Sequence, residues 1–84
     1  MEIRLQKQPK KYLASVDAPT REKLERALEK LKNLEGNIVK LGGTKNMYRC
    51  KMDHYRIIFS YSGGQFIIVE TIDTRTNIKY RRYK

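Results

Sequence analysis

Apolar residues recur along this chain at two different spacings, one helical and one strand-like. A helical stripe predicts a helix over residues 20–34, and its apolar positions are Leu24, Ala27, Leu28, Leu31 and Leu34. A shorter stripe over residues 7–16 predicts a preceding helix, with Tyr12, Leu13 and Val16 on one side. Asp17 is placed to cap the second helix, and Pro19 is tolerated in its first turn. Two consecutive helices are therefore expected in the first half of the chain.

Strand-like alternation appears at both ends of this helical region. Residues 1–5 predict a short first strand, and residues 47–52, 55–60 and 65–72 predict three more. The last of these is apolar on both faces, which favours a central position. Its predicted faces are Phe66, Ile68 and Ile72 against Ile67 and Val69. We interpret residues 37–46 as a loop with a hinge at Gly42 and Gly43.

These elements together predict an α+β fold. Two helices pack on one face of a twisted, mainly antiparallel four-stranded sheet, in the order β-α-α-β-β-β. At 84 residues the chain is expected to form a single domain, residues 1–84, with a thin core. The opposite face of the sheet is left free for function.

The charge of the chain narrows its possible partners. The formal net charge is +10, and residues 37–84 hold ten basic and three acidic residues. A polyanion is the expected partner, with nucleic acid first and an anionic membrane surface second. No apolar run approaches the roughly 20 residues of a membrane span, and no secretory signal is apparent. A single cysteine excludes an internal disulfide, so we expect a cytoplasmic protein.

Basic residues occupy the outward positions of the middle strands. Alternation places Arg49, Lys51 and Arg56 outside the core, whereas Cys50 faces inward. Cations held on a rigid sheet, with a basic tail able to reach them, suit a phosphodiester substrate. The alternative is that these side chains simply solvate an open sheet face. The single histidine, His54, is predicted to be a turn residue rather than an acid–base catalyst.

Several segments together resemble the RelE/ParE superfamily of toxins from bacterial and archaeal toxin–antitoxin pairs. The resemblance covers most of the chain, and the Tyr-Arg-Ile-Ile-Phe strand is its most specific part. The segments are Lys40-Leu41-Gly42-Gly43, Tyr48-Arg49-Cys50-Lys51, Tyr55-Arg56-Ile57-Ile58-Phe59, Ile72-Asp73-Thr74-Arg75 and Tyr80-Arg81.

The resemblance implies a RelE-like endoribonuclease that cleaves messenger RNA on the ribosome and is paired with a cognate antitoxin. The implied partners are the antitoxin, the ribosome and messenger RNA, with no metal, no small-molecule cofactor and no membrane. The alternative within the superfamily is a ParE-like inhibitor of DNA gyrase without nuclease activity. The family pattern carries over to this chain at Arg49, Lys51, Arg56, Arg75 and Tyr80.

In a metal-independent cleavage, each of these residues would have a role. When the 2′-hydroxyl attacks the adjacent phosphorus, negative charge builds on the phosphoryl oxygens, and fixed cations stabilise it. Arg56 and Arg75 are expected to bind the phosphate directly, and Lys51 or Arg49 to hold the RNA backbone. Tyr80 is either a general base or a stacking platform for a nucleobase.

Further basic residues lie outside this set. They could track phosphates of ribosomal RNA or could simply be solvated. These residues are Lys7, Lys10, Lys11, Lys40, Lys45, Arg81 and Arg82.

Overall fold

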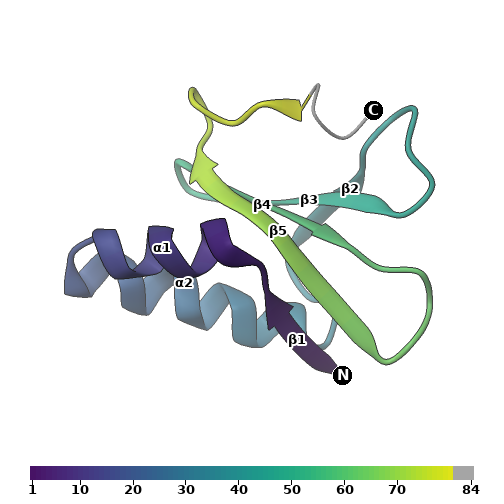
Figure 1. Ribbon diagram of the computed structural model, residues 1–84, viewed down its shortest axis with the longest axis horizontal. Coiled ribbons are helices and arrows are strands. Elements are labelled where there is room, and N and C mark those ends of the chain that lie inside the picture. Colours follow the sequence, from purple (N-terminus) through teal and green to yellow (C-terminus); the bar gives the residue numbers. More distant parts are fainter. Residues whose placement is uncertain (81–84) are drawn as a thin grey trace.

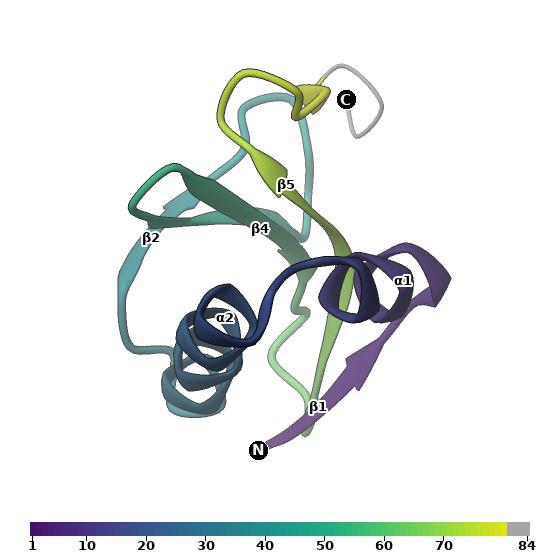
Figure 2. The same cartoon turned by 90° about the vertical axis from the view of Figure 1, so that its left-hand side faces the viewer.

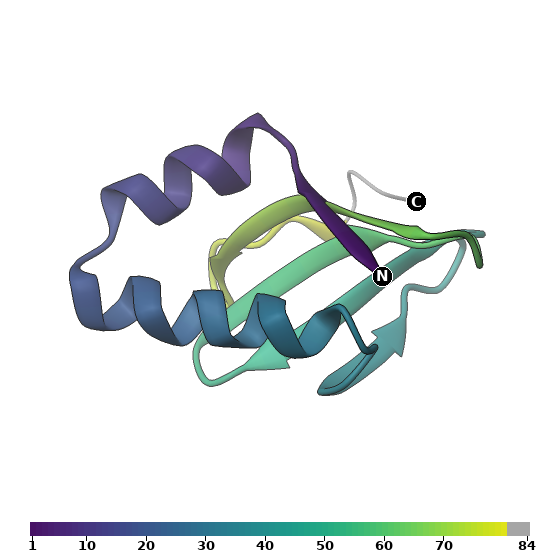
Figure 3. The same ribbon diagram turned by 90° about the horizontal axis from the view of Figure 1, so that it is seen from below.

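A computed structural model describes residues 1–80, which form two helices and a curved sheet (Figure 1). The helices cover one side of the sheet, and residues 75–80 pass over part of the opposite side, which carries neither of the two helices and which we call the open face (Figures 2 and 3). In chain order the elements are β1 (Glu2–Leu5), α1 (Lys7–Ser15), α2 (Ala18–Leu31), β2 (Asn37–Lys40), β3 (Met47–Met52), β4 (Tyr55–Ser60) and β5 (Phe66–Thr74). The predicted α+β class is confirmed.

The sheet has five strands in the order β1-β5-β4-β3-β2, not the four that we predicted. Residues 37–40 form strand β2, antiparallel to β3, where a loop was expected. Only Ile38 of this four-residue strand is apolar and inward-facing, opposite Cys50, so the local pattern was too short to recognise. Strand β1 is parallel to β5, and the remaining pairs are antiparallel.

Helix α2 has the predicted cap at Asp17, but it begins at Ala18 rather than at residue 20 and also ends earlier. The Asp17 carboxylate accepts a hydrogen bond from the Thr20 backbone N–H at 3.2 Å and caps the helix N-terminus. The helix ends at Leu31, whereas the apolar stripe predicted an end at Leu34. Leu34 has a positive φ of 55° and is 39% exposed, so it lies outside both the helix and the core.

The core lies between the helices and the sheet. It consists of Leu24, Leu28, Leu31, Cys50, Ile57, Phe59, Ile67, Val69 and Ile72. Tyr48, Tyr55 and Tyr61 pack against it.

The alternation predicted for β5 is wrong after Val69, because it placed Ile72 on the same face of the sheet as Ile68. Ile58 pairs with Thr71, but Phe59 pairs with Val69, so Glu70 is an extra residue without a partner on β4. This bulge reverses the alternation and turns Ile72 into the core rather than to the side of Ile68.

The amide of Gln8 extends the hydrogen-bond ladder beyond the end of β1. The last backbone bond on this side of β5 runs from the Gln6 N–H to the Val69 carbonyl at 3.0 Å. Gln8 Nε2 then donates to the Ile72 carbonyl at 2.8 Å, and Gln8 Oε1 accepts from the Ile72 N–H at 2.9 Å. A helix side chain thus satisfies both backbone groups of a buried strand residue.

We predict that Gln8→Ala lowers the free energy of unfolding by about 1–3 kcal/mol, because both Ile72 backbone groups lose their partner. Urea unfolding measures this loss. Gln6→Ala is the matched control, since its side chain makes no capping bond to α1. Equal unfolding free energies for the two variants would contradict the role given to Gln8.

Cys50 is buried facing the helices, as predicted, with 3% of its surface exposed. Burial raises the pKa of the Cys50 thiol, and the nearby charge of Arg49 opposes this shift in part. We therefore predict that a thiol reagent labels the native protein at least about 100-fold more slowly than the urea-unfolded protein at pH 7. Comparable rates in the two states would contradict the burial.

No helix within residues 1–80 has the length and apolar content needed to cross a lipid bilayer.

Candidate nucleic-acid interface

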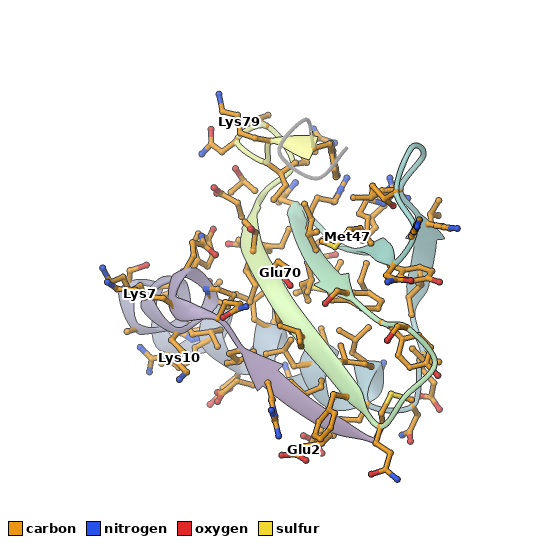
Figure 4. All side chains as sticks on the ribbon, turned by 45° about the vertical axis from the view of Figure 1, so that its right-hand side comes forward. Glu2, Lys7, Lys10, Met47, Glu70 and Lys79 are labelled. Carbon is orange, nitrogen blue, oxygen red and sulfur yellow. The ribbon has the colours of Figure 1, made fainter. Side chains whose placement is uncertain are left out.

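The open face of the sheet is formed by alternate residues of each strand. Cys50, Ile57 and Phe59 point toward the helices, so their strand neighbours point the other way. On β3 and β4 these neighbours are Met47, Arg49, Lys51, Arg56, Ile58 and Ser60. The labels of Met47 and Glu70 in Figure 4 show where this face of the sheet lies.

Three cations occupy adjacent positions on the open face. Lys51 lies directly opposite Arg56, and Arg49 lies opposite Ile58, one step along the same face. Side chains paired in this way have Cβ atoms about 4.5–5.5 Å apart, and like charges at such positions repel each other. No ion pair within residues 1–80 includes any of the three. The strand register thus brings the three cations together on one face, and a bound anion would relieve the repulsion.

Arg56 is not the free outward cation that alternation suggested. Arg56 is only 7% exposed, and its Nη1 donates to the backbone carbonyls of Asp53 and Tyr55, each at 2.9 Å. Asp53 has a positive φ of 53° in the β3–β4 turn, so the guanidinium ties down a tight turn. Its Nε and Nη2 make no hydrogen bond in the described part of the chain.

Arg49 carries an unsatisfied donor. The side chain is half-buried, and its Nε is enclosed but makes no hydrogen bond. An enclosed N–H without an acceptor costs about 1–3 kcal/mol. An anion could contact this atom only if the groups that cover it moved.

Arg75 lies at the same end of the sheet as the β3–β4 turn. It directly follows β5, and its backbone N–H donates to the His54 carbonyl at 2.7 Å. Its side chain is exposed. Because Arg56 binds the carbonyl of Asp53, the residue before His54, both arginines are anchored at one turn. His54 itself is an exposed turn residue, as predicted.

The tail after Arg75 passes the end of the sheet on the side away from α2 (Figures 1 and 2). The Ile78 N–H donates to the Thr74 carbonyl at 3.0 Å and starts a reversal of the chain. Tyr80 is half-buried at the end of the described residues. Its predicted role stays a prediction. Arg81 and Arg82 lie outside the described residues.

The predicted RNA-tracking lysines do not gather with the cations of the open face. Lys7 and Lys10 lie on α1, across β5 from Met47 (Figure 4), and Lys11 is on the same helix. Lys40 pairs with Tyr48, a position on the opposite face from Arg49, and Lys45 is in the β2–β3 loop. All five are exposed and are spread over the surface.

Two carboxylates on β5 border the cations, and sequence reasoning missed both. Asp73 lies opposite Arg56, and its Oδ1 accepts from the Thr74 N–H at 2.8 Å. Glu70 accepts a hydrogen bond from the Ser60 hydroxyl at 3.2 Å. Glu70 faces the open side because its neighbour Val69 faces the core. Alternation from Val69 was therefore the available signal for this carboxylate.

We call Arg49, Lys51, Arg56 and Arg75 the cationic patch, and the chemistry of these side chains suits an anionic group. Arg49 and Arg56 supply guanidinium donors from rigid strands, whereas Lys51 and Arg75 are exposed at the edge. A phosphate with several oxygens matches this donor set.

Comparison with solved structures identifies the fold. The archaeal RelE–RelB complex from Pyrococcus horikoshii OT3 contains a similar chain, with a TM-score of 0.72 and 21% identity over 92% of this chain and 97% of that one. The RelB–RelE antitoxin–toxin complex from Methanococcus jannaschii gives 0.69 and 25% identity over 87% and 91%. The sequence matches no protein-family model and no curated protein. The chain has a RelE-like fold.

Proposed function

We propose that this protein is the toxin of a type II toxin–antitoxin pair and cleaves messenger RNA on the ribosome. The RelE-like fold supports a toxin–antitoxin component. The cationic patch supports the nuclease activity, and the single observation that carries it is that Arg49, Lys51 and Arg56 lie side by side on one face and form no ion pair within residues 1–80. A phosphodiester would bind to such a group of cations.

The nucleophile of the proposed reaction is the 2′-hydroxyl of the RNA itself. It attacks the adjacent phosphorus, the P–O5′ bond breaks, and the leaving 5′-oxygen takes up a proton from water, so that a 2′,3′-cyclic phosphate and a 5′-hydroxyl result. Arg56 and Arg75 stabilise the charge on the phosphoryl oxygens, and Lys51 or Arg49 holds the backbone. Tyr80 takes the proton from the 2′-hydroxyl or stacks on a base. Because the side chains offer few acid–base groups, the reaction depends on the ribosome to orient the messenger.

We further propose that a cognate antitoxin covers the cationic patch. Both similar structures are complexes with RelB. An acidic or amphipathic segment would neutralise part of the +10 charge and block access to Arg49 and Arg75. A complex that retains full cleavage activity would contradict this proposal.

The test combines the purified protein with translating ribosomes and maps messenger ends by primer extension. Discrete new ends are expected with ribosomes present, and none with naked messenger. A gyrase supercoiling assay runs in parallel, because a ParE-like protein would block supercoiling and leave the messenger intact. That result, obtained with folded protein free of antitoxin, would overturn the nuclease proposal.

A further inference from the structure

A small hollow opens on the sheet at the β4–β5 hairpin, at the opposite end of β4 from Arg56. Its volume is about 220 Å³, below the range of about 300–1,000 Å³ that is typical of sites for drug-sized ligands. The side chains that line it are those of Asn46, Ser60, Tyr61, Ser62, Phe66 and Ile68. We propose that this hollow holds one nucleobase of the bound RNA, stacked on Phe66. This inference rests on the proposed function and names a contact of the substrate that positions it.

Phe66 has the properties of a stacking platform. It is 41% exposed, which is unusual for a phenylalanine, and it lies at the start of β5. The Arg4 guanidinium carbon lies 4.1 Å from the centre of its ring. Arg4 reaches the ring from β1, on one side of β5, whereas the rest of the hollow is built from the β3–β4 side. The cation–π contact fixes the ring and leaves its other side to the hollow.

Polar groups at the rim are free to bind the edge of a base. Within residues 1–80, neither the side-chain amide of Asn46 nor the hydroxyl of Ser62 takes part in a hydrogen bond. The backbone carbonyl of Asn46 accepts from the Tyr61 N–H at 2.9 Å, so the amide is held beside the hollow. An amide offers both donors and an acceptor, as the edge of a nucleobase requires.

The charge at the hollow selects a base over a phosphate. Glu70 accepts the hydroxyl hydrogen bond of Ser60, which places a carboxylate next to the hollow. A phosphate in this position would face like charge, whereas a neutral base with amino donors would not. The occupant that fits is therefore a base whose phosphate lies elsewhere.

The register of the strands sets the distance from the hollow to the cationic patch. The row of Met47, Ser60 and Ile68 borders the row of Arg49, Ile58 and Thr71 on the same face. Neighbouring rows are two residues apart along a strand, about 7 Å, and Phe66 lies one row beyond Ile68. A base stacked on Phe66 therefore belongs to a nucleotide that flanks the one whose phosphate is bound at Arg49, and stacking would fix the register of the RNA on the sheet.

The test uses a short single-stranded RNA that carries the fluorescent base 2-aminopurine. We expect the wild-type protein to quench its fluorescence through stacking. Phe66→Leu keeps the apolar bulk but removes the aromatic face, so it should weaken RNA binding about 5- to 150-fold and abolish the quenching. Phe66→Tyr keeps the ring and should retain both. Leu34→Ala is the matched control, because Leu34 is also an exposed apolar residue, 39% exposed, outside the open face.

The outcomes separate this inference from the proposed function. Absence of quenching by the wild-type protein, or equal binding and quenching by folded Phe66→Leu, would overturn the base-binding hollow even if messenger cleavage is observed. Quenching that depends on Phe66, in a protein that cuts no messenger on ribosomes, would uphold the hollow and overturn the nuclease proposal instead.

Discussion

Replacing Arg75 with alanine is expected to reduce single-turnover messenger cleavage about 100- to 1,000-fold, the typical loss for one donor to a developing negative charge. The midpoint of thermal unfolding of the Arg75→Ala variant should stay at the wild-type value. The reason is that the Arg75 side chain is exposed, whereas its anchoring bond to His54 uses the backbone N–H. Cleavage by primer extension and melting by circular dichroism measure the two quantities.

Arg26→Ala is the matched control for this variant. Arg26 is an exposed arginine on α2, on the helix side of the sheet, so its loss removes the same charge without touching the open face. We expect wild-type cleavage from Arg26→Ala at moderate salt. An equal loss in both variants would mean that net charge, rather than a positioned guanidinium, drives the activity.

Replacing Arg56 with alanine is expected to lower both stability and activity. Two charge-assisted hydrogen bonds to the Asp53 and Tyr55 carbonyls disappear from a site that is only 7% exposed. We expect a loss of about 2–4 kcal/mol in the free energy of unfolding, measured in urea. Cleavage should also fall by at least about 100-fold, when it is measured at a temperature where the variant is folded.

Arg56→Lys separates the two roles of this residue. Lysine keeps the positive charge but lacks the planar fork that bridges the turn carbonyls and a phosphate. We expect intermediate stability and a cleavage rate close to that of Arg56→Ala. Wild-type stability in Arg56→Ala would contradict the structural role, and wild-type cleavage by the folded protein would contradict the catalytic one.

Strand alternation alone predicted the main feature of the candidate site. Lys51 and Arg56 face each other on the open side, and Arg49 lies on the same face, because Cys50, Ile57 and Phe59 fill the core. This inference succeeds because side chains in a regular strand alternate strictly between faces. The sequence also located both helices and the strands that contain the cations.

Other features depend on contacts between distant residues and had no local pattern. The burial of Arg56 follows from the path of the β3–β4 turn, whose carbonyls it binds. The bulge at Glu70 arises in the pairing of β4 with β5. Strand β2 exists because β3 offers it a partner, and Gln8 meets Ile72 across 64 positions of sequence. Such pairings are decided by the assembled sheet.

The central claim is that the cationic patch cleaves messenger RNA held on the ribosome. It is tested most directly by mapping messenger ends from ribosome complexes treated with wild-type protein, Arg49→Ala, Arg75→Ala and Arg26→Ala side by side. We predict discrete cuts with wild-type protein and Arg26→Ala, and a loss of about 100-fold or more with the other two. Intact messenger with the folded wild-type protein, or full cleavage by both patch variants, would contradict the claim.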